Sequence, residues 1–149
     1  TLDRSSAASV LYKRQVFLEL VFTNYQRLLR IDNFFIALID QYTKHLYAAF
    51  VVEDGERLPE REGRHHVVDL AEIEHVISTG QMMDITDEDG RVWWLAPLNA
   101  GADTLGVLYT FFDDETVIRP RQKQLFTIFA DRTAVALSLI HISEPTRPY

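Results

Sequence analysis

The sequence predicts an α+β domain in which a central, largely antiparallel sheet of about five to six strands carries an N-terminal and a C-terminal helix on one face. Two observations favour this class. Two pairs of apolar, β-prone segments are each joined by a short polar stretch, which is typical of antiparallel hairpins. A helical pattern of apolar residues precedes the first pair, and another follows the second pair. The length of 149 residues suits a single domain.

The first predicted helix covers residues 16–30, where polar side chains recur every three or four positions and apolar ones fill the remainder. Its apolar stripe is wider than one packing surface requires. The helix therefore either packs on a second subunit as well as on its own domain, or it lies deep in its own core. Asp32 and Asn33 end the pattern.

The first hairpin is predicted over residues 34–52. Residues 34–39 are an unbroken apolar run, which is typical of a central strand covered on both faces. Residues 40–45 supply a polar turn, and residues 46–52 form the second strand. The following residues 53–64 are the most polar part of the domain, and we expect a mobile exposed loop there.

A short helix is expected to begin near Leu70, with Asp69 as its N-cap, and to end at Gly80. A short strand over residues 82–85 and a turn over residues 87–90 follow.

The second hairpin pairs residues 92–98 with residues 105–112 across the turn 99–104. Pro97 has no amide donor, so its strand should be irregular or at an edge there. The last helix is predicted over residues 119–137, with Pro120 at an early position.

Composition excludes several function classes. The chain has 15 basic and 22 acidic side chains, a net charge of −7, which argues against a nucleic-acid partner and against an anionic membrane surface. No apolar run approaches the ~20 residues of a membrane span. No secretory signal opens the chain, so we expect a cytoplasmic protein. The absence of cysteine removes disulfides, thiolate nucleophiles and cysteine-ligated metals.

Both ends of the chain resemble translated sequencing-adapter sequence. Near the start, residues 5–9 and 12–15 follow one adapter, with Val10 and Leu11 departing from it; residues 137–147 follow the opposite adapter strand throughout. We expect residues 1–15 and 138–149 to be adapter-derived and residues 16–137 to be the domain, a fragment of a longer, metagenomic reading frame. The alternative is a natural polar arm and tail.

Five stretches of the domain, together with its last helix, share one recognisable pattern: residues 32–40, 50–55, 76–80, 94–98 and 105–108. With the order of elements over residues 16–137, this pattern resembles a GAF domain, the small sensory module of bacterial signalling proteins. The resemblance is closest to the form that stands upstream of diguanylate cyclase or histidine kinase output domains. It departs from the common pattern between Gly63 and Ala71, next to the usual ligand pocket.

The resemblance implies a non-catalytic sensory module. It would bind an unidentified small molecule under the covering segment 55–91 and would relay the change through the terminal helices, within a homodimer, to a C-terminal output domain that the chain lacks. A second hypothesis is a degenerate GAF domain that acts only as a dimerisation or spacer module. A third, an enzyme on a similar sheet, would need polar side chains clustered in one cleft.

The cofactor is left unknown. A covalently held bilin and the related sulfoxide reductases need cysteines, and the Asn-Lys-Phe-Asp-Glu signature of cyclic-nucleotide-binding members is missing. No catalytic or metal-ligating residues are predicted. The adjacent His65 and His66 should point to opposite faces of a strand, and no histidine pair has zinc-site spacing. His75 as a single axial haem ligand is neither supported nor excluded.

Two groups of residues are predicted to carry the function. An aromatic-rich apolar sheet suits a small, largely apolar ligand with one or two polar handles, although these aromatic side chains also fit an ordinary core. The predicted ligand pocket consists of Phe35, His65, His66, Trp93, Trp94, Tyr109 and Phe111. The predicted dimer and relay residues on the terminal helices are Phe17, Val21, Leu28, Leu125 and Phe129.

Overall fold

The computed structural model describes residues 2–113 and 119–142. Within them, one antiparallel sheet has the strand order β3-β2-β1-β7-β6-β5, and β4 pairs with β2 off this path. The predicted α+β class and antiparallel pairing are confirmed. The strands are β1 (Phe34–Ile39), β2 (Leu46–Glu53), β3 (Glu56–Arg57), β4 (Gly63–Val68), β5 (Met83–Thr86), β6 (Val92–Ala100) and β7 (Asp103–Phe112).

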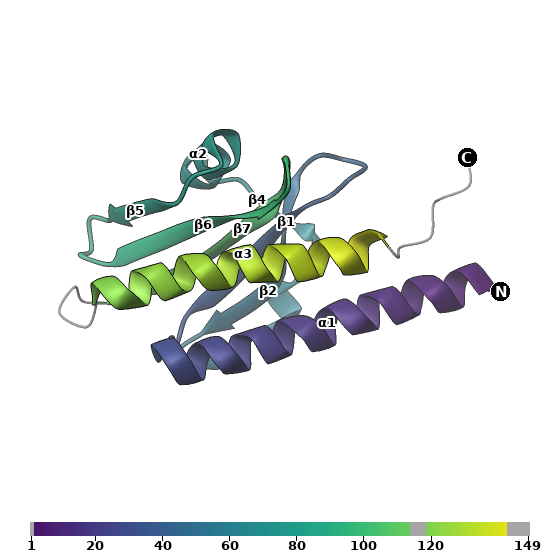
Figure 1. Ribbon diagram of the computed structural model, residues 1–149, viewed down its shortest axis with the longest axis horizontal. Coiled ribbons are helices and arrows are strands. Elements are labelled where there is room, and N and C mark those ends of the chain that lie inside the picture. Colours follow the sequence, from purple (N-terminus) through teal and green to yellow (C-terminus); the bar gives the residue numbers. More distant parts are fainter. Residues whose placement is uncertain (1, 114–118, 143–149) are drawn as a thin grey trace.

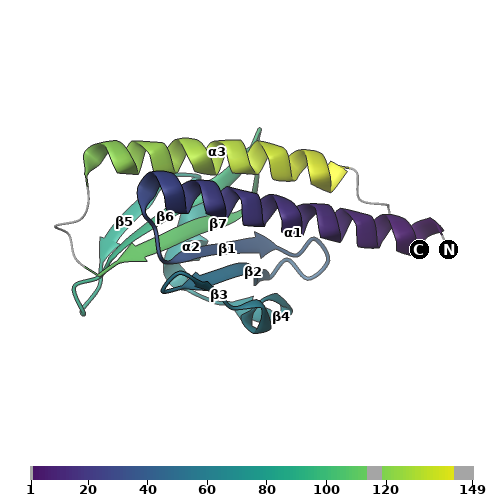
Figure 2. The ribbon, with the colours of Figure 1, turned by 90° about the horizontal axis from the view of Figure 1, so that it is seen from below.

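Two long helices cover one face of the sheet and a short helix lies on the other (Figures 1 and 2). Helix α1 (Leu2–Leu29) and helix α3 (Pro120–Ile142) lie side by side and run in opposite directions. Helix α2 (Ala71–Thr79) packs on the opposite face. We call the two faces the α1/α3 side and the α2 side. No helix formed by the described residues is long and apolar enough to cross a membrane.

Strand alternation divides the core between the two faces. In β1, Phe34 and Ile36 belong to the core cluster on the α1/α3 side, whereas Phe35 and Ala37 belong to the cluster on the α2 side. This explains why β1 has no polar alternation: both of its faces are buried. Gly106 of β7 allows the close approach to β1, because a Cβ there would lie 2.0 Å from the carbonyl oxygen of Ala37.

The terminal helices are joined by a buried polar contact. The hydroxyl oxygens of Tyr25 and Thr133 lie 3.1 Å apart, and both side chains are buried. The Tyr25 ring also packs on Phe129, with ring centroids 4.6 Å apart. Burial raises the pKa of Tyr25, so its hydroxyl stays protonated. The contact fixes the register of α1 against α3.

Both terminal helices extend beyond their predicted bounds. Helix α1 begins at Leu2 and passes residue 15 without a break, with Val10 and Arg14 buried, and α3 continues past residue 137. A helical conformation is compatible with both interpretations of these residues, a natural arm and translated adapter. Of the second stretch, residues 143–149 lie outside the described residues, as does residue 1 of the first.

The segment 53–64 is mostly exposed, as predicted, but the expectation of a loop without regular structure is wrong. Strand β3 pairs with β2, a 3₁₀ helix η1 (Pro59–Arg61) follows, and β4 begins at Gly63. The charged side chains misled the prediction because several of them pair with one another: Arg57 pairs with Glu62, and Arg61 with Glu53. We call residues 56–62 the edge segment.

Two local predictions need correction and two are confirmed. Asp69 does not cap α2; the N-cap position is Leu70, which makes no side-chain bond there. Gly80 does end the helix, in the left-handed conformation. The second hairpin is longer than expected, because β6 and β7 continue to Ala100 and Asp103 and leave a two-residue turn. A register shift follows Pro97, beyond the end of the β5 pairing, as its missing amide predicts.

Candidate functional site

Four of the predicted pocket residues meet on the α2 side of the sheet. Phe35 of β1 lies opposite Tyr109 of β7, and Trp93 of β6 lies opposite Phe111, so strand register brings the four rings together. Ring centroids are 5.0 Å apart for Phe35 and Tyr109 and 4.8 Å apart for Trp93 and Phe111. Phe35, Tyr109 and Phe111 are 6–9 % exposed, and Trp93 is half-buried. We call these four side chains the aromatic cluster.

Asp87 positions Trp93, the half-buried member of the aromatic cluster. One carboxylate oxygen accepts the indole N–H of Trp93 at 2.9 Å, and the other accepts the backbone N–H groups of Asp89 and Arg91. The bond from Trp93 is the largest of the effects that lower the pKa of Asp87. One side chain thus shapes the turn between β5 and β6 and orients the indole.

Cations flank the aromatic cluster. The guanidinium carbon of Arg91 lies 4.8 Å from the ring centroid of Phe111. Burial raises the pKa of Tyr109 to about 12, and the positive charge of Arg61 acts weakly in the other direction. Tyr109 therefore stays a neutral phenol at physiological pH. The cluster combines stacked rings, one hydroxyl and nearby positive charge.

The two histidines of the predicted pocket lie on β4, but not as expected. Their ring centroids are 4.3 Å apart, so they do not point to opposite faces. The reason is that β4 is irregular: its pairing with β2 passes from Tyr47↔Val67 to Ala48↔Gly63, so residues 64–66 have no partner in the register. Within the described part of the chain, no group of three or more His, Asp or Glu side chains suits a metal ion.

Trp94 lies on the α1/α3 side, away from the aromatic cluster. It is 1 % exposed and packs against Phe112 and against Phe126 of α3. Adjacent strand residues point to opposite faces, so Trp93 and Trp94 do not share one pocket.

Comparisons with known proteins show similarity in structure alone. No family model and no curated protein matches the chain. The second GAF domain of DevS from Mycobacterium smegmatis superposes with a TM-score of 0.67 at 22 % identity, over 87 % of this chain and 96 % of that one. The cyanobacteriochrome receptor PixJ gives a TM-score of 0.68 at 16 % identity, over 89 % and 99 %. The chain has the GAF fold.

The same fold also occurs in an enzyme. A type II free methionine-R-sulfoxide reductase from Thermoplasma acidophilum superposes on this chain with a TM-score of 0.56 at 10 % identity, over 95 % of this chain and 96 % of that one. The GAF fold therefore does not by itself decide between sensing and catalysis.

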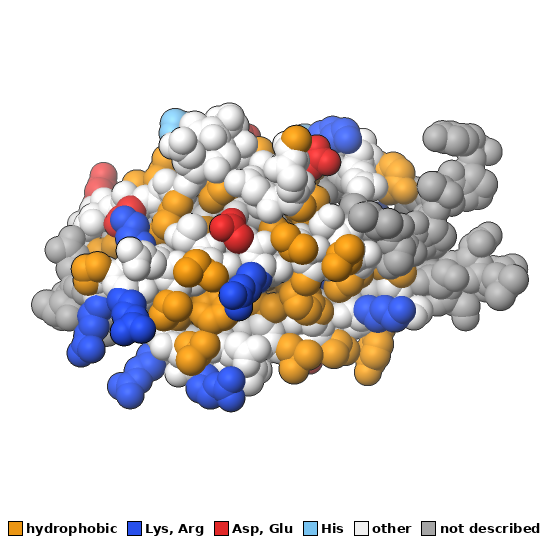
Figure 3. Space-filling model, viewed as in Figure 1, with side chains coloured by type: hydrophobic (Ala, Val, Ile, Leu, Met, Phe, Trp, Pro, Cys, Tyr) orange, Lys and Arg blue, Asp and Glu red, His pale blue; other side chains and the backbone are white. Residues whose placement is uncertain are grey.

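The predicted dimer and relay residues differ in how deeply the fold buries them. Val21 is buried in its own core, and Phe17, Leu125 and Phe129 are half-buried against the same core. Only Leu28, of these five, is exposed, at 54 %. Other apolar side chains of α1 and α3 point outward, and Figure 3 shows apolar side chains gathered over these helices. Within residues 16–137, the exposed large apolar side chains of these two helices are Val16, Leu20, Leu28, Ile128 and Val135.

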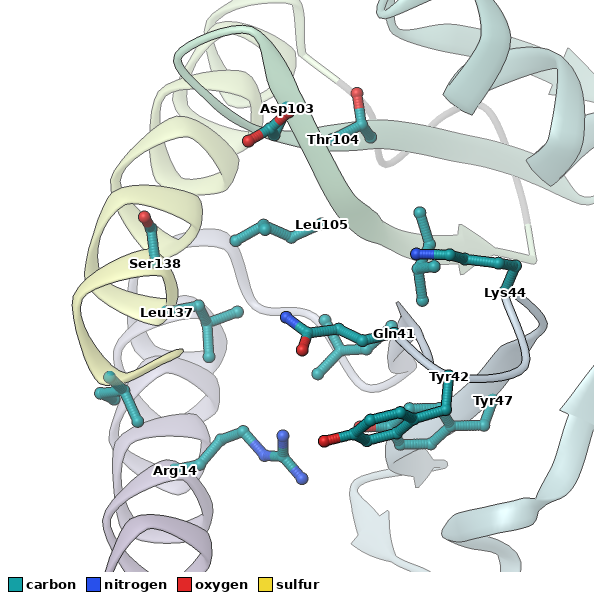
Figure 4. A pocket seen from close by; sticks show the side chains of 13 residues that line it. Arg14, Gln41, Tyr42, Lys44, Tyr47, Asp103, Thr104, Leu105, Leu137 and Ser138 are labelled. Atoms are coloured by element: carbon teal, nitrogen blue, oxygen red, sulfur yellow. The ribbon is translucent and has the colours of Figure 1, made fainter. Parts of the chain in front are cut away.

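A hollow of about 800 Å³, which the sequence did not indicate, lies at the other end of the GAF fold from the β5–β6 turn. Figure 4 shows Gln41 and Arg14 reaching into it from different elements, with the rings of Tyr42 and Tyr47 beside Arg14. Its walls come from α1, the β1–β2 turn, the β6–β7 hairpin and α3, so no local motif marks it. Arg14, Ser138 and Ile140 of its lining lie outside residues 16–137, the range predicted to be the natural domain. The aromatic cluster lies wholly within that range, so we take it as the candidate site.

Proposed function

We propose that this chain is a non-catalytic sensory module that binds a small molecule at the aromatic cluster and relays the change through α1 and α3 to an output domain. The observation that carries this proposal is the unequal covering of the sheet. Two long helices shield one face, whereas the aromatic cluster lies on the face that carries the short helix α2 and borders the irregular β4. A ligand can reach such a face without disrupting the main core.

The chemistry of the aromatic cluster favours a flat, largely apolar ligand with one polar or anionic group. Stacked rings accept a planar molecule at offset distances like those between Phe35 and Tyr109. The neutral hydroxyl of Tyr109 and the charges of Arg61 and Arg91 suit a single polar handle. The absence of cysteine argues against thiol chemistry and a thioether-linked chromophore.

Native mass spectrometry of the freshly purified chain tests the proposal. We expect a reproducible added mass that Phe111→Ala abolishes. Phe112→Ala is the matched control, because the neighbouring ring packs on Trp94 on the other face; it should retain the added mass. An unmodified mass for the wild-type chain would reject ligand binding.

One observation favours the alternative of a spacer module without a ligand. The four rings of the aromatic cluster contact one another closely, as side chains of a filled core do. A chain that carries no added mass yet associates as a dimer would support this alternative.

We also propose that the chain forms a homodimer through the outward apolar side chains of α1 and α3. Leu20 and Val135 are 59 % and 55 % exposed, on helices that already cover their own core. Sedimentation velocity should show a dimer that Leu20→Asp converts to a monomer. Val67→Asp is the control, since Val67 is equally exposed but lies on β4. A monomeric wild-type chain would end the proposal.

Finally, we propose a cytoplasmic protein whose natural domain is residues 16–137, with residues 1–15 and 138–149 derived from adapter. The main core supports this division, because the core clusters consist of residues 17–137. A chain trimmed to residues 16–137 should retain the circular dichroism spectrum and a cooperative unfolding transition. A trimmed chain that fails to fold would contradict it.

A further inference from the structure

Arg57 of the edge segment bonds to two separate parts of the molecule. Its Nη1 donates to a carboxylate oxygen of Glu19 on α1, and its Nη2 donates to the side-chain oxygen of Gln15 on the same helix at 2.6 Å. Its Nε and Nη2 donate to the two carboxylate oxygens of Glu62, at 3.2 and 2.9 Å. Glu19 and Glu62 both lie within residues 16–137, whereas Gln15 is the last residue of the stretch predicted to be adapter-derived.

Glu62 fixes the position of Arg57 from the β4 side. Its side chain is 9 % exposed, and the oxygen that receives Arg57 Nε also accepts the backbone N–H of Val51 at 2.9 Å. Glu62 immediately precedes β4, the irregular strand that borders the α2 side. A bidentate arginine–carboxylate pair is directional, so a shift of Glu62 changes where the guanidinium points.

The guanidinium of Arg57 also lies against the core beneath α1. Its central carbon is 4.6 Å from the ring centroid of Phe50, and that ring lies 6.1 Å from the ring of Phe22 on α1. The neighbouring ion pair of Arg61 differs from the bonds of Arg57 in its partner and exposure. Arg61 pairs with Glu53 of β2, and both side chains are more than a third exposed. Arg57 therefore joins the edge segment to the helix, whereas Arg61 joins it only to the sheet.

We propose that Arg57 is a coupling residue, through which displacement of Glu62 on the β4 side releases Glu19 and loosens the middle of α1. The proposal rests on the proposed relay through the terminal helices and names the route by which α1 is reached. Among the described residues, the partners of Glu62 are the backbone of Val51 and the guanidinium of Arg57, so its influence on α1 passes through the guanidinium.

Hydrogen–deuterium exchange on the ligand-free chain tests the coupling. Glu62→Gln removes the charge and one acceptor, and we expect amides of residues 16–26 to exchange about tenfold faster, with little change in α3. Arg61→Gln is the matched control in the same segment and should leave both helices unchanged. Glu19→Gln should reproduce the effect on α1 while leaving the edge segment protected.

The double variant decides between coupling and two independent contacts. If Arg57 couples the two carboxylates, Glu62→Gln adds little to the exchange of α1 once Glu19 is replaced. Both substitutions are made in a chain with Gln15→Ala, which removes the other bond from Arg57 to α1. Additive effects of the two substitutions, or equal acceleration in α1 and α3, would overturn the proposal. Because no ligand takes part, an unmodified mass in native mass spectrometry would reject the sensory function and leave this result standing.

Discussion

The two faces of the sheet are built from the same strands but differ in how they are covered. On the α1/α3 side, aromatic rings such as Phe34, Trp94 and Phe126 are at most 1 % exposed beneath two long helices. On the α2 side, a helix of nine residues and an irregular strand leave Trp93 half-buried. The difference teaches that the same strands can bury one face fully and leave a large aromatic side chain partly exposed on the other.

Trp93 and Trp94 offer the strongest test of this comparison, because they are neighbours on opposite faces. Trp94→Ala should lower the free energy of unfolding by ~3–5 kcal/mol, since it leaves a large cavity under α3. Trp93→Ala should cost about 1–2 kcal/mol, because its ring is only half-buried. Urea denaturation, monitored by circular dichroism, measures the free energy of unfolding of both variants. Equal losses would mean that the two faces contribute alike.

The contact between α1 and α3 should have the next largest effect. Tyr25→Phe removes one hydroxyl of a buried pair and should destabilise the chain by about 1–2 kcal/mol in chemical denaturation. Thr133→Val should cost a similar amount. The double variant should recover part of the loss, because neither side then keeps an unpaired buried hydroxyl; a fully additive loss would show that the two hydroxyls do not interact.

Alkaline titration should distinguish the α2 side through Tyr109. Burial raises its pKa to about 12 in the folded chain, against ~10 when unfolded, so folding favours the protonated phenol. This contribution to stability is complete below pH ~10 and is lost as the pH rises toward 12. In the Tyr109→Phe variant, phenolate absorbance should show one fewer tyrosine that titrates near pH 12 than in the wild-type chain. An unchanged titration curve would mean that the group titrating near pH 12 is not Tyr109.

The smallest expected effect concerns Asp87, which orients Trp93 from an exposed turn. Asp87→Asn should shift the indole N–H resonance of Trp93 in a nitrogen–proton correlation spectrum and leave that of Trp94 in place. Because the pKa of Asp87 is lowered in the folded chain, the bond should persist at neutral pH and be lost only as the pH falls through that lowered value. Movement of both resonances would point to a wider rearrangement.

The sequence was most informative where structure is local. The apolar run 34–39 coincides with β1, because six apolar residues in succession suit a strand buried on both faces. Phe35, Trp93, Tyr109 and Phe111 come together through strand register. Trp94 was grouped with them although adjacent strand residues alternate.

What sequence reasoning missed depends on contacts between distant residues. Arg57 and Glu62 look like ordinary solvated charges within a polar stretch, and their bond partners on α1 and β2 leave no local pattern. The same holds for the edge segment as a whole, since a two-residue strand carries too few side chains to show a period.

The hydroxyl pair of Tyr25 and Thr133 limits the kinds of motion open to the terminal helices. An axial slide of one helix past the other by a full turn of ~5.4 Å would separate the two hydroxyls in a dry environment. A common tilt of both helices over the sheet keeps them together. The hydroxyl pair therefore opposes sliding of α1 along α3 and leaves a joint tilt of the two helices as the motion that keeps this contact.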